Sequence, residues 1–152
     1  RILSVELNKQ TAQICKSNLI STASDLIVNT HLEVLCAEVI TTLKRGCKKK
    51  SRTFIEKYPN QDFRFDFIYI DPPYNSELYN LILENLLDGN WLKKESIVIC
   101  EFSKSLKPEI SSNWLKVNEK RYGNIGLFFL TPSQAYHSLD DTDSRQPQKD
   151  PQ

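Results

Sequence analysis

The apolar residues of this chain gather in short runs that alternate with segments of helical spacing, and no other feature of the sequence constrains its fold as much. Four runs have the length of a strand: Ile2–Leu7, Leu32–Val39, Phe65–Ile70 and Ser96–Phe102. Each of the first three is followed by apolar residues at spacings typical of an amphipathic helix. Strands that alternate with helices predict a doubly wound α/β sheet whose ligands bind at the carboxyl ends of the strands.

The ends of these segments carry residues that favour helix starts, helix stops and tight turns. Asn8 is suited to cap a helix after the first strand, and Asp88-Gly89-Asn90 is suited to end a helix over Glu77–Leu87. Trp114–Arg121 and Gly126–Leu130 predict a terminal antiparallel hairpin, because the Gly and Asn between them tolerate the positive φ of a tight turn.

The composition predicts one soluble globular domain. The chain has 152 residues, of which 39% are hydrophobic and 26% are charged, and no apolar run approaches the roughly 18 residues of a membrane span. No signal-peptide pattern is visible either, so we expect a cytoplasmic monomer with no membrane association. We assign residues 1–132 to a partial domain and residues 133–152, rich in Asp, Ser, Gln and Pro, to a disordered tail.

The front of the chain has an unusual composition. There is no methionine, and the chain opens at Arg1 directly on a strand-length apolar run. A core strand with no residues leading into it is typical of a chain whose front is absent. We therefore expect the sequence to be an amino-terminally truncated fragment.

The cysteines and the basic residues leave metal and polyanion binding weakly supported. Cys15, Cys36, Cys47 and Cys100 lack the close spacing of zinc ligands, so we expect free thiols and no metal. The net charge is only +1, although basic residues gather in the stretch 44–57. That stretch suits a solvated loop and an RNA-phosphate contact equally well.

A short motif, Asp71-Pro72-Pro73-Tyr74, follows the run Phe65–Ile70. That run is rich in aromatic and β-branched residues, so we expect a strand buried on both faces. Each Pro lacks a backbone N–H and fixes its own φ, which makes the motif a rigid loop rich in hydrogen-bond acceptors. The motif also suits a plain turn or a ligand of a WW-type domain, but such a ligand belongs in a disordered segment.

Acceptors are what the exocyclic amino group of a base needs, because its lone pair is delocalised into the ring. The Asp71 carboxylate and the Pro72 carbonyl could accept its two N–H groups while the nitrogen attacks a methyl sulfonium. Tyr74 could stack on a flipped base. We therefore take Asp71, Pro72 and Tyr74 as candidate catalytic residues, with Pro73 and Tyr74 in contact with the base.

These features together resemble the guanine-N2 methyltransferases of small-subunit (16S-type) ribosomal RNA, within the Rossmann-like class I methyltransferases. The likeness spans Arg1 to about Thr131. It rests on the following segments: Val5-Glu6, Asp71-Pro72-Pro73-Tyr74, Val98-Ile99-Cys100-Glu101 and Arg121-Tyr122-Gly123. The resemblance implies S-adenosyl-L-methionine as the cofactor and ribosomal RNA or the small ribosomal subunit as the partner.

The resemblance also implies roles for single acidic residues. Glu6 matches a family residue that holds the ribose hydroxyls of the cofactor, and Asp71 also lies against the cofactor in the family. Glu38 is the nearest counterpart of an Asp or Asn beside the adenine, although its side chain is longer. Glu101 matches a family position that faces the site, but an acid at a strand end is also typical of a plain surface residue.

The chain departs from the family at its front. Neither the first strand of the family nor the glycine-rich loop that wraps the methionine part of the cofactor is found in it. The absent strand would lie between the strand of Glu6 and the strand that leads to Asp71, which would leave unpaired backbone groups there. We therefore expect this chain alone to bind S-adenosylmethionine weakly or not at all.

The favoured function is methyl transfer to the N2 amino group of a guanine in small-subunit ribosomal RNA. A DNA adenine-N6 or cytosine-N4 methyltransferase would use the same motif for the same amino-group chemistry, although the sequence has no obvious target-recognition domain. A non-catalytic remnant, or an RNA-binding module that retains the motif, is the third hypothesis.

Overall fold

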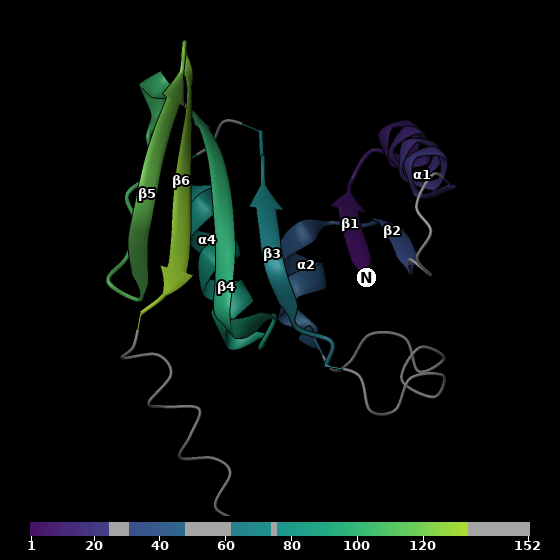
Figure 1. Cartoon of the computed structure of the whole chain (residues 1–152), viewed down its shortest axis with the longest axis horizontal. Coiled ribbons are helices and arrows are strands. Elements are labelled where there is room, and N and C mark those ends of the chain that lie inside the picture. The colour runs from purple at the N-terminus through teal and green to yellow at the C-terminus, as the bar shows by residue number, and fades with distance from the viewer. Residues whose placement is uncertain (25–30, 48–61, 74–75, 134–152) are drawn as a thin grey trace, which may run out of the picture.

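The computed structural model describes residues 1–24, 31–47, 62–73 and 76–133 of the chain. Helices and strands alternate in its first half, and a hairpin ends it (Figure 1). In chain order the elements are β1 (Ile2–Glu6), α1 (Lys9–Ser24), β2 (Leu32–Cys36), α2 (Val39–Lys44), β3 (Phe65–Ile70), α4 (Ser76–Asp88), β4 (Leu92–Ser103), the short 3-10 helix η2 (Lys104–Leu106), β5 (Trp114–Tyr122) and β6 (Ile125–Pro132).

The strands form two sheets. β1 and β2 pair in parallel, and a four-stranded sheet has the order β3-β4-β6-β5, in which β3 and β4 are parallel and the other pairs antiparallel. This mixed α/β architecture confirms the predicted fold class. β1 lies beside β3 (Figure 1), but no backbone ladder joins these two strands. The sequence interpretation places an absent strand at this position, and that remains a prediction.

The Arg1 side chain contacts both sheets. The Arg1 guanidinium lies 5.3 Å from the centre of the Phe65 ring in β3, and its Nη2 lies 3.6 Å from a carboxylate oxygen of Glu33 in β2. The guanidinium is therefore held by an aromatic face from one sheet and by a carboxylate from the other.

The core lies between α4 and one face of the four-stranded sheet. Tyr79 and Leu83 of α4 pack there with Val98, Cys100 and Phe128 of the central strands, and none of these side chains is more than 2% exposed. The spacing of the apolar residues in α4 places them on one side of the helix, so the sheet and the helix bury matching faces.

Buried Trp91 ties this core to the end of α2. Its indole N–H donates to the carbonyl of Leu43 at 3.0 Å, which satisfies a polar group that would otherwise be costly to bury. Figure 1 shows α2 and α4 on the same side of the strands. Contacts at this junction therefore fix the end of one helix against the end of the other.

The prediction that β3 is buried on both faces is wrong. Ile70 is buried, but Phe67 is 73% exposed and Tyr69 is 58% exposed. Side chains alternate between the faces of a strand, α4 covers the face of Ile70, and no helix among the described residues covers the other face (Figure 1). We call this second face the open face of the sheet.

The predicted helix ends and the predicted hairpin are confirmed. The Asn8 side chain accepts from the backbone N–H of Gln10 at 2.9 Å and caps α1. Asn90, at φ 52°, ends α4, where the N–H of Trp91 donates to the carbonyl of Leu86, as in a Schellman motif. β5 and β6 are joined by a turn at Gly123, whose φ is 58°.

Two further predictions concern the second strand and the end of the chain. The apolar run Leu32–Val39 forms a shorter strand than expected, because Glu38 caps α2 and so ends the extended segment. The proposed tail lies outside the described residues beyond Ser133. In the part of the chain that the structure describes, no helix has the length and apolar character needed to cross a membrane.

The tight approach of Gly89 to its surroundings gives a test of the core. A Cβ atom at this position would lie 2.4 Å from Trp91 Nε1 and 2.8 Å from the Leu43 carbonyl oxygen. Gly89 directly follows α4, and this clash involves backbone and a buried ring. We expect Gly89→Ala to lower the free energy of unfolding by about 1–3 kcal/mol in urea denaturation.

The control is Glu84→Ala on the exposed side of α4, for which we expect a change within about 0.5 kcal/mol. Equal stability of Gly89→Ala and the parent chain would contradict the packing described for the Trp91 junction.

Candidate active site

The first three residues of the motif leave β3 at its carboxyl end. Asp71 and Pro73 are exposed and Pro72 is buried, so the middle proline anchors a loop whose own φ values are fixed. The carboxyl ends of β1 and β3 lie at the same edge of the molecule (Figure 1). We call this edge the carboxyl edge. Tyr74 lies outside the described residues.

Strand pairing places a second carboxylate beside Asp71. Ile70 pairs with Cys100 across the parallel β3–β4 ladder, so the next residue of each strand, Asp71 and Glu101, are neighbours at the carboxyl edge. The Tyr69 hydroxyl donates to the Glu101 carboxylate, which shows that these side chains meet on the open face. The sequence resemblance named Glu101, and the structure brings it together with the motif.

Glu101 is also held through its backbone. Its carbonyl accepts a hydrogen bond from the hydroxyl of Tyr79, a fully buried residue of α4. A buried hydroxyl with a partner is favourable, whereas an unpaired one is costly. The helix under the sheet therefore helps to fix the strand position from which the Glu101 side chain projects.

The site shifts the proton affinities of its groups in one direction. Partial burial raises the pKa of the Asp71 carboxyl above its usual value, and the negative charge of Glu101 raises it further. The hydrogen bond to Glu101, with burial and nearby negative charge, raises the pKa of Tyr69 to about 12. Asp71 is therefore a better proton acceptor than an isolated aspartate, and Tyr69 stays a hydrogen-bond donor at neutral pH.

Glu6 stands at the end of β1, at the same edge. One carboxylate oxygen accepts from the backbone N–H of Asn8 at 2.7 Å, and no partner for the other oxygen lies among the described residues. The N–H of Ala37 donates to the Glu6 carbonyl at 3.0 Å, which fixes the backbone at the strand end. The second oxygen is thus available to accept from a ligand hydroxyl.

Glu38 has a structural role that the sequence interpretation did not include. Its two carboxylate oxygens accept from the backbone N–H groups of Ile40 at 2.7 Å and Thr41 at 2.6 Å, so it caps α2. Hydrogen bonds from Thr41, which outweigh desolvation, lower the pKa of the Glu38 carboxyl. Its suggested contact with the adenine remains a prediction.

Tyr69 and Tyr79 are the site residues that sequence reasoning missed. Tyr69 had a usable signal, because it stands two residues before Asp71 in a strand and so shares its face. Tyr79 had none, since its spacing in α4 is that of any core residue. Its contact with Glu101 depends on how the helix packs.

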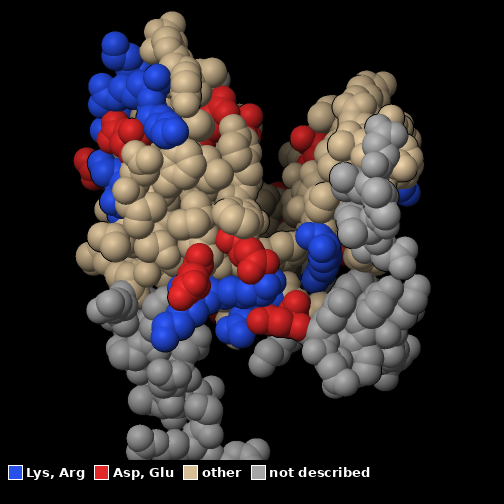
Figure 2. Space-filling view, viewed as in Figure 1, with Lys and Arg blue, Asp and Glu red and all other residues tan. Residues whose placement is uncertain are grey.

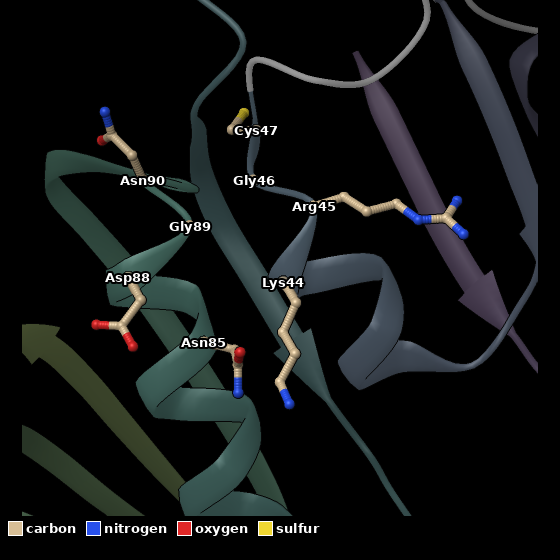
Figure 3. A pocket seen from close by; sticks show the side chains of 8 residues that line it. All are labelled: Lys44, Arg45, Gly46, Cys47, Asn85, Asp88, Gly89 and Asn90. Carbon is tan, nitrogen blue, oxygen red and sulfur yellow. The ribbon is translucent and has the colours of Figure 1, made fainter.

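The pocket in Figure 3 is separate from the candidate active site. It has a volume of about 540 Å³ and lies where α2 and α4 end. The N–H of Phe65 donates to the Trp91 carbonyl near this pocket, so the pocket is at the amino end of β3, away from Asp71. Lys44 and Arg45 line it. The remaining basic residues of the stretch 44–57 lie outside the described residues.

The cysteines are free thiols, as predicted. Cys47 is buried beside this pocket, where its Sγ lies 3.0 Å from the Phe63 carbonyl oxygen. Among the residues that the structure describes, no group of three or more His, Cys, Asp or Glu side chains is placed to hold a metal ion.

Comparison with known proteins places the chain in a family. The family model described as Conserved hypothetical protein 95 matches residues 1–131. The chain is 30% identical over 138 residues to an uncharacterized methylase of Rickettsia prowazekii, covering 84% of this chain and 57% of that protein. It is 28% identical over 123 residues to ribosomal RNA small subunit methyltransferase D of Buchnera aphidicola subsp. Baizongia pistaciae, covering 80% of this chain and 53% of that protein.

The chain thus spans about half the length of the curated relatives it matches. Among solved structures it resembles a Haemophilus influenzae protein named as a candidate methylase, with a TM-score of 0.63, 22% identity and coverage of 87% and 72% of the two chains. It also resembles the SAH-bound methyltransferase PaMTH1 of Podospora anserina, with a TM-score of 0.58, 13% identity and coverage of 88% and 61%.

These two structures show the fold, and the family model, with the related sequences, shows the family. The chain therefore belongs to the family described as Conserved hypothetical protein 95, the methyltransferases related to ribosomal RNA small subunit methyltransferase D, and it has their class I methyltransferase fold.

Proposed function

We propose that the protein represented by this chain transfers a methyl group from S-adenosylmethionine to the N2 amino group of a guanine in small-subunit ribosomal RNA. The observation that carries this proposal is the acceptor-rich Asp71-Pro72-Pro73 segment at the carboxyl edge, with Glu101 beside it. The name of the Buchnera relative supports the RNA class. The choice of guanine N2 rests on the motif chemistry and the resemblance.

The residues at the end of β3 suit an amino group as the acceptor of the methyl group. The Asp71 carboxylate and the Pro72 carbonyl accept its two N–H groups, and this directs the nitrogen lone pair away from the ring plane. The raised pKa of Asp71 helps it to receive the proton that the nitrogen loses after methylation. In this proposal Pro73 and Tyr74 contact the target base, with Tyr74 stacked on its face.

The carboxylates of Glu6, at the end of β1, and of Glu38, which follows β2, suit the cofactor. S-adenosylmethionine supplies an electrophilic methyl group bound to a sulfonium sulfur. The second oxygen of Glu6 fits a ribose hydroxyl, because it is a strong acceptor at the carboxyl edge with no partner among the described residues. We propose Glu38 near the adenine and Asp71 near the sulfonium as further contacts. The partner is ribosomal RNA or the small subunit, in the cytoplasm.

Replacing Asp71 tests the proposal. In the whole protein we expect Asp71→Ala to lower methyl incorporation into small-subunit ribosomal RNA by about 10²–10³-fold, because the amino group loses its charged acceptor. The measurement follows radiolabelled methyl groups from S-adenosylmethionine and identifies N2-methylguanosine after digestion of the RNA.

The matched control is Asp66→Ala, which removes an exposed carboxylate from the other end of β3, where it pairs with Lys93. We expect this variant to keep the activity of the parent. An unchanged rate for Asp71→Ala would refute the assigned role. Label found only in duplex DNA would replace the RNA reaction by adenine-N6 or cytosine-N4 methylation, and no label in either substrate would favour a non-catalytic remnant.

The pH dependence gives a second test of the same site. Because burial and Glu101 raise the pKa of Asp71, the carboxylate is lost at a higher pH than for an ordinary aspartate. We expect kcat/KM to fall as the pH drops through this raised pKa. Glu101→Gln removes the neighbouring negative charge, lowers the pKa of Asp71 and should move this acidic limb to lower pH.

Glu95→Gln serves as the comparison, since Glu95 is exposed near the start of the same strand. An acidic limb that stays in place in Glu101→Gln, or that moves to higher pH, would show that Asp71 and Glu101 are not coupled as described.

A further inference from the structure

Basic side chains gather at the β5 edge of the four-stranded sheet. Figure 2 shows them over the upper part of β5 and β6. The exposed residues of this group are Lys104, Lys107, Lys116, Lys120 and Arg121. We call this group the hairpin cations. They flank the carboxyl edge, because β4 and β5 both end there, beside the turn of the hairpin.

One carboxylate lies among the hairpin cations. The Glu119 oxygens lie 2.8 Å from the Arg121 guanidinium and 3.1 Å from the ammonium groups of Lys107 and of Lys116. Hydrogen bonds lower the pKa of Glu119 to about 2, and the bond from Arg121 contributes the most. A single negative charge cannot neutralise three cations, so this cluster keeps a positive excess at all physiological pH values.

The other two hairpin cations have no acidic partner among the described residues. Lys104 stands next to the turn, since its backbone N–H donates to the Asn124 carbonyl at 2.8 Å. Lys120 lies near the carboxyl end of the edge strand β5 and pairs with Leu127 of β6. Free ammonium groups held on a rigid hairpin are suited to phosphate oxygens.

The strand register places Lys120 in line with the candidate active site. Leu127 pairs with Lys120 on one side and with Glu101 on the other. Paired residues point to the same face of a sheet, so Lys120 and Glu101 share the open face. Neighbouring strands are about 4.8 Å apart, which puts the Lys120 backbone about 10 Å from that of Glu101.

An exposed aromatic residue accompanies these cations. Tyr122 follows Lys120 by two residues on the same face of β5 and is 60% exposed. Cationic side chains together with an exposed aromatic ring are the combination with which proteins bind single-stranded nucleic acids, because the ring stacks on a base.

We infer that Lys104, Lys120 and Tyr122 form a docking surface for the backbone of the RNA strand next to the target nucleotide. This inference rests on the proposed function, because it takes RNA as the substrate. The location about 10 Å from Glu101 allows a base to reach the site while a neighbouring phosphate meets Lys120. The cations and the ring together favour RNA over an acidic protein.

The test measures RNA binding by this chain, with no need for methyl transfer. The probe is a fluorescently labelled single-stranded RNA oligonucleotide, followed by anisotropy over a series of salt concentrations. The variant replaces Lys104 and Lys120 together by Ala. Each phosphate contact contributes about 0.7 to the slope of log K against log salt. We therefore expect the slope to fall by about 1.4 and the Kd to rise about tenfold.

A matched variant removes the same number and kind of charges from the amino end of β4, away from the carboxyl edge. Lys93 and Lys94 replaced by Ala lower the net charge equally, and we expect at most a small change in Kd. Tyr122→Ala alone should raise the Kd several-fold at every salt concentration without changing the slope. Circular dichroism melts of the variants check that the hairpin still folds.

Three results would overturn the docking surface: no RNA binding by the parent chain, equal weakening by the two double variants, or competition by polyglutamate that matches competition by unlabelled RNA. The last result would assign the surface to an acidic protein. Failure of the proposed function looks different. A whole protein that methylates no RNA, but loses RNA binding in the hairpin variant, would keep the surface and remove the activity.

Discussion

The parallel pairing of β3 with β4 is the interaction on which the candidate site depends. Its register sets Ile70 opposite Cys100, and this alone makes Asp71 and Glu101 neighbours. A slip of one residue would turn every side chain of β3 to the opposite face. Burial of Ile70 and Cys100 against α4 therefore fixes the register of β3 and β4. This register in turn determines which carboxylates meet at the carboxyl edge.

The two faces of the four-stranded sheet have different roles. The face on α4 is packed, and Tyr79 is buried there without any exposed surface. Close packing on that side leaves the strands little freedom to shift. On the open face, Tyr69 and Glu101 are joined by a hydrogen bond yet remain accessible. A rigid support on one side thus allows polar groups to be held in place on the other without being buried.

Much of this arrangement follows from local sequence signals. The bounds of the strand Phe65–Ile70 agree with the prediction to the residue, as does the cap at Asn8, and α4 ends within the predicted stop Asp88-Gly89-Asn90, because each depends on neighbours in the chain. The exposure of Phe67 was mispredicted, since burial depends on which layers cover a sheet and not on strand composition. The bond between Tyr69 and Glu101 joins residues 32 positions apart, so only the strand register reveals it.

If the substrate is RNA, as proposed, the negative charge at the carboxyl edge must be reconciled with phosphate binding, and the hairpin cations would do this. Two adjacent carboxylates are suited to an amino group, but they repel the phosphates of a nucleic acid. A cation directly beside Asp71 would lower its pKa and weaken it as a proton acceptor. Lys120 lies three strands from Asp71 in the order β3-β4-β6-β5, about 14 Å away, which is beyond the Debye length of about 8 Å at physiological salt. In the proposed docking role, Lys120 at this distance would attract a phosphate while leaving the proton affinity of Asp71 nearly unchanged.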